Sequence, residues 1–102
     1  MNIKDKQSLL NFVSRMGMFI LVQDRSSIIS YLHGYEEARL RECLFLRLLS
    51  ERVAKQYRIR HLSDGWWGQL DRLSNKLNKS WEDTFRLIAF EILEPTANSL
   101  QS

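Results

Sequence analysis

Apolar residues recur at helical spacing through most of the chain. In residues 27–57 they fall three or four positions apart, and this stretch has no proline and a single glycine, Gly34. Such spacing is typical of amphipathic helices. We predict a central pair of helices here, with a bend near Gly34, because glycine in a helix costs about 1 kcal/mol relative to alanine. In residues 43–49 every position except Arg47 is apolar, so we expect burial on more than one face.

Three more helices follow from the same spacing. The first lies near the N-terminus, with Asp5 as its N-cap. A second begins after Asp64, and a third stops before Pro95, because the residue before a proline leaves the helical region. We therefore predict an all-α fold, a compact bundle of four to five helices. It forms a single domain over residues 1–94, and residues 95–102 form a flexible C-terminal tail.

The segment Met18–Val22 interrupts the helical pattern, because all of its residues are apolar. Its β-branched and aromatic residues would suit a strand, but the chain offers no second strand to pair with it, and a lone strand is not stable. We interpret the segment as a buried connector or as the first turns of the next helix.

Length and composition fit one ordinary globular domain. The chain has 102 residues, of which 44% are hydrophobic and 26% are charged. The N-terminus lacks the pattern of a signal peptide, and the longest apolar run is far shorter than the roughly 20 residues that cross a bilayer. We therefore predict a cytoplasmic protein that does not enter a membrane. Cys43, the only cysteine, is predicted to pack in the core.

Charge is distributed unevenly, although the net charge is only +3. Residues 39–61 carry seven Lys/Arg and two Asp/Glu, whereas residues 63–102 carry four and six. The basic part contains the segment 52–61, which could contact phosphates. Binding of nucleic acid through this segment, as a small regulator, is the alternative function, and its residues would be Arg52, Lys55, Arg58 and Arg60. It is less favoured because no helix-turn-helix pattern accompanies the charge.

No motif for catalysis, metal binding or cofactor binding is evident. His33 and Glu37 are spaced i, i+4 on a helix, but no second histidine completes a metal-binding motif. The neighbouring acids Glu82 and Asp83 point about 100° apart on a helix and do not form a catalytic pair. We therefore predict a protein that is not an enzyme, with no catalytic residue, no metal and no cofactor.

Trp67 is the first candidate for contact with a partner. It lies about 100° around the helix from Trp66 and therefore falls off the apolar stripe. Asp64 and Asp71 flank it in the sequence, and tryptophan is among the residues that dominate the energetics of interfaces. Half-burial of Trp67 within the bundle is the other interpretation.

Three features together resemble a family of small bacterial immunity proteins. Residues 15–19, Arg-Met-Gly-Met-Phe, are similar to the Arg-Pro-Gly-Met-Tyr that ends the first helix in that family. Residues 27–38 resemble the helix that follows, which carries a Phe/Leu–x–Gly–Tyr motif. Trp67 and the helix at 80–93 resemble the tryptophan-bearing segment and the last helix. The resemblance covers about residues 12–93, and Met16 and Phe19 depart from the family's proline and tyrosine.

The resemblance implies a function in protection against toxins. These proteins neutralise the toxin domains of contact-dependent growth inhibition and related polymorphic toxin systems. It implies an inhibitor that binds the C-terminal nuclease domain of a cognate toxin, in some cases a tRNase, and occludes its active site. The motifs themselves look structural, so the resemblance does not transfer a toxin-binding site.

Charge complementarity suggests which surface would meet such a toxin. Nuclease grooves are basic because they bind phosphate, and an acidic inhibitor surface would complement them and speed association. We place the partner-binding residues in the acidic C-terminal half, at Asp64, Trp67, Asp71, Glu82 and Asp83. The net charge of +3 also leaves open contact through the basic middle. A monomer is favoured, and a helical adaptor or homodimer is the third interpretation.

Overall fold

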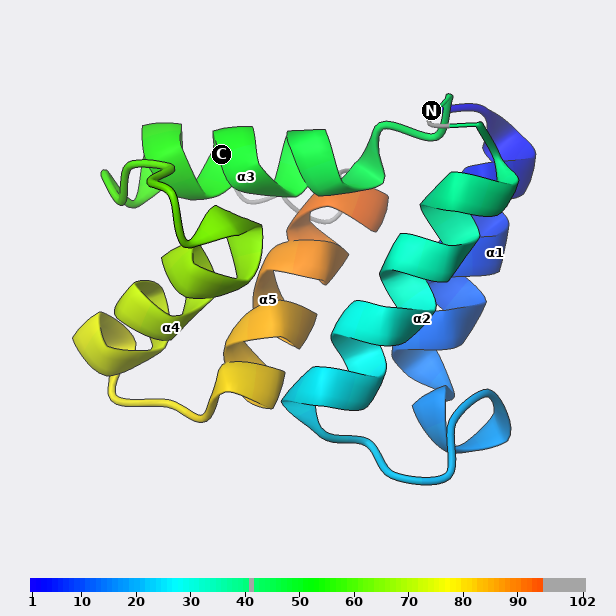
Figure 1. The fold of residues 1–102 in the computed structure, drawn as a ribbon, viewed down its shortest axis with the longest axis horizontal. Coiled ribbons are helices and arrows are strands. Elements are labelled where there is room, and N and C mark those ends of the chain that lie inside the picture. The colour runs from blue at the N-terminus through cyan, green and yellow to red at the C-terminus, as the bar shows by residue number, and fades with distance from the viewer. Residues whose placement is uncertain (41, 95–102) are drawn as a thin grey trace.

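The computed structural model describes residues 1–40 and 42–94. Over these residues it contains five α-helices and one 3-10 turn, and no strand (Figure 1). The elements are α1 (Ile3–Ser14), η1 (Met16–Met18), α2 (Arg25–Ala38), α3 (Phe45–Gln56), α4 (Gly65–Leu77) and α5 (Trp81–Leu93). The predicted all-α bundle of four to five helices is confirmed. The predicted tail at 95–102 lies outside the described residues.

Helix α5 is the element around which the other helices pack. It makes close contacts with α1, α3 and α4 and lies in the middle of the molecule (Figure 1). Its buried side chains cover roughly half of its circumference, counted at 100° per residue. They are Trp81, Thr84, Phe85, Ile88, Ala89 and Leu93. The centre of the bundle is therefore α5 and not the stretch 27–57, so the expectation of a central helical pair there is wrong.

The predicted bend near Gly34 is also wrong. Helix α2 runs through Gly34 without interruption, and a Cβ added there would meet no atom within 4 Å. The helix instead ends at Ala38, and α3 begins at Phe45. Leu40 and Leu44 have φ angles of 53° and 63°, in the left-handed region that leucine seldom adopts. The break therefore lies at two leucines whose type does not signal a turn.

The N-terminus of α3 is capped by a side chain from α2. Leu44 occupies the N-cap position and supplies no side-chain hydrogen bond. The carboxylate of Glu36 instead accepts a hydrogen bond from the backbone N–H of Leu46, at 3.2 Å. The first N–H groups of a helix lack partners within the helix. This bond therefore gives the N–H of Leu46 a partner and joins α3 to α2.

Asp5 does not cap α1 but lies buried within it. The N-cap is Asn2, whose side chain accepts the N–H of Asp5 at 2.8 Å. The Asp5 carboxylate accepts hydrogen bonds from the hydroxyl of Tyr35, at 2.7 Å, and from Nε of Arg39, at 2.8 Å. The Tyr35 hydroxyl, and after it Arg39, hold the pKa of Asp5 below its usual value, although burial opposes them. This cluster joins α1 to α2.

The apolar stripes of α4 and α5 are largely buried, as their spacing predicts. Leu77 and Ile92 are only half-buried, whereas the other stripe residues, Trp66, Leu70, Leu73, Trp81, Phe85 and Ile88, are in the core. Residues 43–49 are buried mainly on one face. Cys43, Phe45 and Leu49 are in the core, but Leu44 and Leu48 are exposed. The expectation of burial on more than one face therefore holds only in part.

Within the described residues, no helix combines the length and apolar character needed to cross a membrane.

Candidate protein-binding surface

The segment Met18–Val22, here called the apolar connector, lies largely on the surface. Met18, Phe19, Leu21 and Val22 expose 77%, 44%, 103% and 60% of their surfaces. The connector is exposed because η1 turns the chain sharply. The N–H groups of Phe19 and Ile20 both donate to the carbonyl of Met16, at 2.9 Å, so Met16 enters the core and the next residues project outward. The segment is a connector, as one interpretation held, but the expected burial is wrong.

The base of the apolar connector is fixed by aromatic packing. The ring of Phe19 meets Phe12 and Tyr31 edge-on, with centroids 5.7 and 5.8 Å apart. Phe12 and Tyr31 stack on each other at 4.0 Å. Beside these rings lies an open hollow of about 570 Å³ between the connector and the start of α2, which Leu21 and Val22 help to line. Leu21 and Val22 are therefore exposed beside a packed group of aromatic rings.

Charged residues of α5 lie next to the connector's C-terminal end. The guanidinium of Arg86 approaches Asp83 Oδ1 at 3.4 Å and Gln23 Oε1 at 3.3 Å, and Gln23 directly follows the connector. Arg86 also approaches the sulfur of Met16, at 3.9 Å. Arg86 therefore contacts the two residues that flank the turn and the apolar connector, Met16 and Gln23, and Asp83 lies next to Arg86.

Asp71 lies near the same end of the molecule. Arg25, the first residue of α2, donates to both of its carboxylate oxygens, at 3.1 and 2.8 Å. The guanidinium of Arg25 also lies over the ring of Trp81, 5.7 Å from its centroid. Three of the five predicted partner-binding residues, Asp71, Glu82 and Asp83, thus gather where α2 and α5 begin. We call them, with Arg25 and Arg86, the polar rim.

Asp64 and Trp67 lie at the start of α4, before Asp71, and the carbonyl of Trp67 accepts a hydrogen bond from the indole N–H of Trp81 at 3.0 Å. Asp64 pairs with Arg72 at 3.1 Å, and its side chain occupies the space that a Cβ on Gly68 would fill. Trp67 is half-buried, and its ring packs over Gly65, whose φ is +75°. It also meets His33 edge-on, with centroids 5.4 Å apart. These contacts give both residues a local structural role.

Ion pairing reduces the negative charge that the predicted site offers. Asp64, Asp71 and Asp83 each pair with an arginine. Glu82 has no ion pair among the described residues. Arg25 and Asp71 lie 46 positions apart in the chain, so no local sequence pattern could have revealed that pair. The surface near the connector therefore carries charges of both signs.

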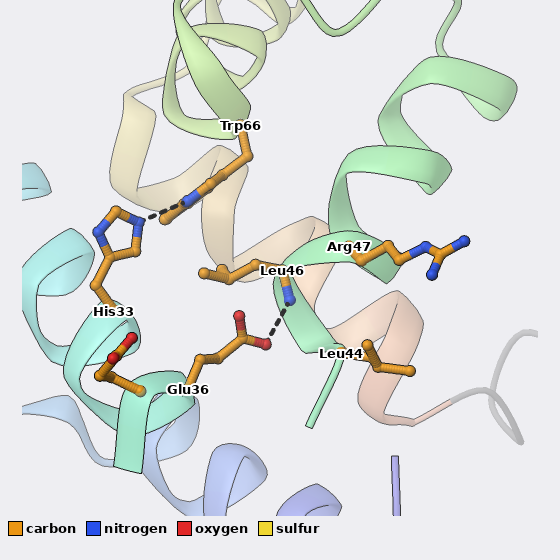
Figure 2. Close-up of a pocket in the computed structure, with 7 residues that line it drawn as sticks. His33, Glu36, Leu44, Leu46, Arg47 and Trp66 are labelled. Atoms are coloured by element: carbon orange, nitrogen blue, oxygen red, sulfur yellow. Dashed lines mark hydrogen bonds between the residues drawn. The ribbon is translucent and has the colours of Figure 1, made fainter. Parts of the chain in front are cut away.

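A second hollow, of about 440 Å³, lies between α2 and α3 (Figure 2). The indole N–H of Trp66 donates to Nε2 of His33 at 3.1 Å, which gives His33 a structural role. Arg47 points away from the hollow and pairs with Glu51 at 3.2 Å. The lining residues are His33, Glu36, Glu37, Leu44, Leu46, Arg47 and Trp66. They include no serine, threonine, cysteine or lysine that could act as a nucleophile.

The remaining candidate groups are the thiol of Cys43, the acidic and histidine side chains, and the basic segment 52–61. Burial raises the pKa of the Cys43 thiol, which favours its unreactive protonated form. In residues 1–40 and 42–94, no group of three or more His, Cys, Asp or Glu side chains is arranged to hold a metal ion. In the basic segment 52–61, Arg52 pairs with Glu91 at 2.7 Å. Lys55, Arg58 and Arg60 are exposed.

Comparison of the chain with models of known protein families, with curated proteins and with solved structures finds no match.

Proposed function

We propose that this chain is an immunity protein that binds a cognate toxin domain and occludes its active site. The observation that carries the proposal is the apolar connector, which exposes four large apolar side chains beside a polar rim. Protein interfaces combine an apolar centre with a polar surround. Contiguous exposed apolar side chains commonly mark a site of interaction. The assignment of a toxin, and of a nuclease in particular, comes from the family resemblance.

The resemblance and the surface meet in the same part of the chain. Residues 15–19, which resemble the family's Arg-Pro-Gly-Met-Tyr motif, form the turn that leads into the apolar connector. Met16 is buried under this turn, whereas Met18 and Phe19 belong to the exposed connector. One part of the motif therefore builds the turn, and the other part contributes to the proposed contact surface.

The acidic residues of the polar rim would form ion pairs with basic groups of the toxin. Asp71 and Asp83 can exchange their arginine partners for basic groups of the toxin, and Glu82 can accept such a group directly. Each rim pair is at least one-third exposed on both partners, so its own contribution to stability is small. Exchange of partners would therefore cost little. In this arrangement the apolar connector supplies most of the affinity, and the rim affects orientation and the rate of association.

The first experiment is to purify the tagged protein from its own cells, after nuclease treatment and at moderately high salt. We expect one stoichiometric partner that is the C-terminal part of a large exported chain. That domain is then expressed and assayed for nuclease activity with and without the protein. Recovery of no such domain, or a recovered domain whose activity the protein does not inhibit, would contradict the proposal.

Substitutions then test the contact surface. Leu21→Asp places a charge at the centre of the connector, and we expect it to weaken toxin binding by about 2 kcal/mol or more, as at an interface hot spot. Ile3→Asp is the matched control, because Ile3 is also exposed and lies at the opposite end of α1. If both variants bind the toxin domain with equal affinity, the interface lies elsewhere. In that case Trp67→Ala would test whether the start of α4 contacts the toxin.

A further inference from the structure

Four basic side chains gather where α3 ends. They are Lys55, Arg58, Arg60 and Lys76, and all are exposed. Among the described residues none of them forms an ion pair, whereas the arginines at positions 25, 39, 47, 52, 72 and 86 all do. We call these four residues the basic end.

Acidic groups on the neighbouring elements do not offset this charge. Glu51 on α3 pairs with Arg47, Asp64 before α4 pairs with Arg72, and Glu91 on α5 pairs with Arg52. Glu91 also accepts the hydroxyl of Tyr57, at 2.8 Å. Each carboxylate is thus already matched by an arginine. The basic end therefore keeps an uncompensated positive charge.

The backbone that carries the basic end is held in place. Nζ of Lys76 donates to the carbonyl of Tyr57 at 3.1 Å, which joins the C-terminal part of α4 to the end of α3. Gln69 is fully buried, and its amide donates to the carbonyls of Ile59, at 2.9 Å, and of Ser50, at 3.2 Å. Ile59 lies between Arg58 and Arg60, so both side chains leave a fixed segment. Such preorganisation lowers the entropic cost of binding.

The chemistry of this surface suits phosphates better than an acidic protein. Leu62 is the only large apolar side chain in residues 55–62 that is strongly exposed, whereas a protein interface normally has an apolar centre. Contacts with phosphates need only basic groups and carry no sequence information. The hydroxyl of Tyr57 is engaged by Glu91 and its ring is half-buried, so it does not offer an open face for stacking on bases.

From these observations we infer that the basic end binds the phosphate backbone of nucleic acid, without sequence preference. This inference is independent of the proposed immunity function, because it concerns other residues at a different end of the molecule. If all four cations contact phosphates of a duplex, the logarithm of the binding constant falls with log salt at a slope of about −3.6. Affinity would drop about 150-fold between roughly 50 and 200 mM salt.

The test is fluorescence anisotropy with a labelled DNA duplex of about 20 base pairs and arbitrary sequence, titrated at several salt concentrations. The double variant Lys55→Gln/Arg60→Gln removes two cations of the basic end, and we expect the slope to become shallower by about 2. The control Lys4→Gln/Arg15→Gln removes two exposed cations outside the basic end, and we expect it to leave the slope nearly unchanged.

Three results would overturn the inference. The first is no binding of the duplex at about 50 mM salt, where the electrostatic term is strong. The second is an equal change in both double variants, which would assign binding to overall charge. The third is displacement of the duplex by an equal concentration of short poly-glutamate, which would assign the basic end to an acidic protein partner.

Discussion

Tyr35→Phe should destabilise the protein through the loss of one buried hydrogen bond. The Tyr35 hydroxyl donates to Asp5 at 2.7 Å, and Asp5 is only 2% exposed. Hydrogen bonds to charged groups contribute about 1.5–3 kcal/mol, and a buried acceptor that loses its donor cannot turn to water instead. We therefore expect the free energy of unfolding to fall by about 1.5–3 kcal/mol near pH 7, measured by urea denaturation.

The same substitution should have a smaller effect in acid. The pKa of folded Asp5 lies below its ordinary value of 3.8, so the unfolded state binds this proton more readily. The stabilisation is complete above the unfolded pKa and is lost as the pH falls through the lower folded pKa. Tyr35→Phe moves the folded pKa back towards 3.8. The difference between the wild type and the variant should therefore shrink as the pH falls from about 5 to about 3.

Tyr31→Phe is the matched control for this experiment. Tyr31 is also a half-buried tyrosine of α2, but no hydrogen bond of its hydroxyl is found among the described residues. Its loss should change the free energy of unfolding by less than about 0.5 kcal/mol. The reasoning is refuted if both variants lose the same stability, or if the loss in Tyr35→Phe does not depend on pH.

Two further substitutions test the fold. Gly34→Ala should raise the free energy of unfolding by up to about 1 kcal/mol, because Gly34 is helical and has space for a Cβ; a loss of stability would show that α2 does need glycine there. Gln69→Leu leaves the carbonyls of Ser50 and Ile59 without their donor, and thermal unfolding should reveal a loss of about 2–4 kcal/mol. An unchanged melting temperature would show that water replaces the amide.

The helices themselves could be predicted from the sequence, because apolar residues recur every three or four positions and these positions are largely the buried ones. Most residues of the α4 and α5 stripes are in the core where the spacing places them, although Leu77 and Ile92 are only half-buried. The division between α2 and α3 could not be predicted, because it depends on left-handed leucines and on a cap that Glu36 supplies from ten positions away. Helix propensity alone pointed to Gly34, where the packing imposes no break.

The surface was harder to predict than the core. An apolar run such as 18–22 indicates burial on average, and nothing within it shows that η1 will turn it outward. The arginine partners of Asp64 and Asp83 lie close to them in the chain, at Arg72 and Arg86. The partner of Asp71 could not be predicted, because Arg25 lies on α2, 46 positions away. Whether these residues contact a partner stays a prediction.

The central position of α5 has a consequence for the order in which the molecule can form. Helices α1, α3 and α4 all pack against α5, which follows them in the chain. During synthesis these helices emerge before α5, so the parts of their apolar faces that pack on α5 are covered only after it has been made. Contacts between α4 and α5 require the shortest loop closure, so we expect the long-range docking of α1 to follow them. A chain interrupted before Trp81 would therefore lack the helix against which α1, α3 and α4 pack, and would not be a smaller version of the same protein.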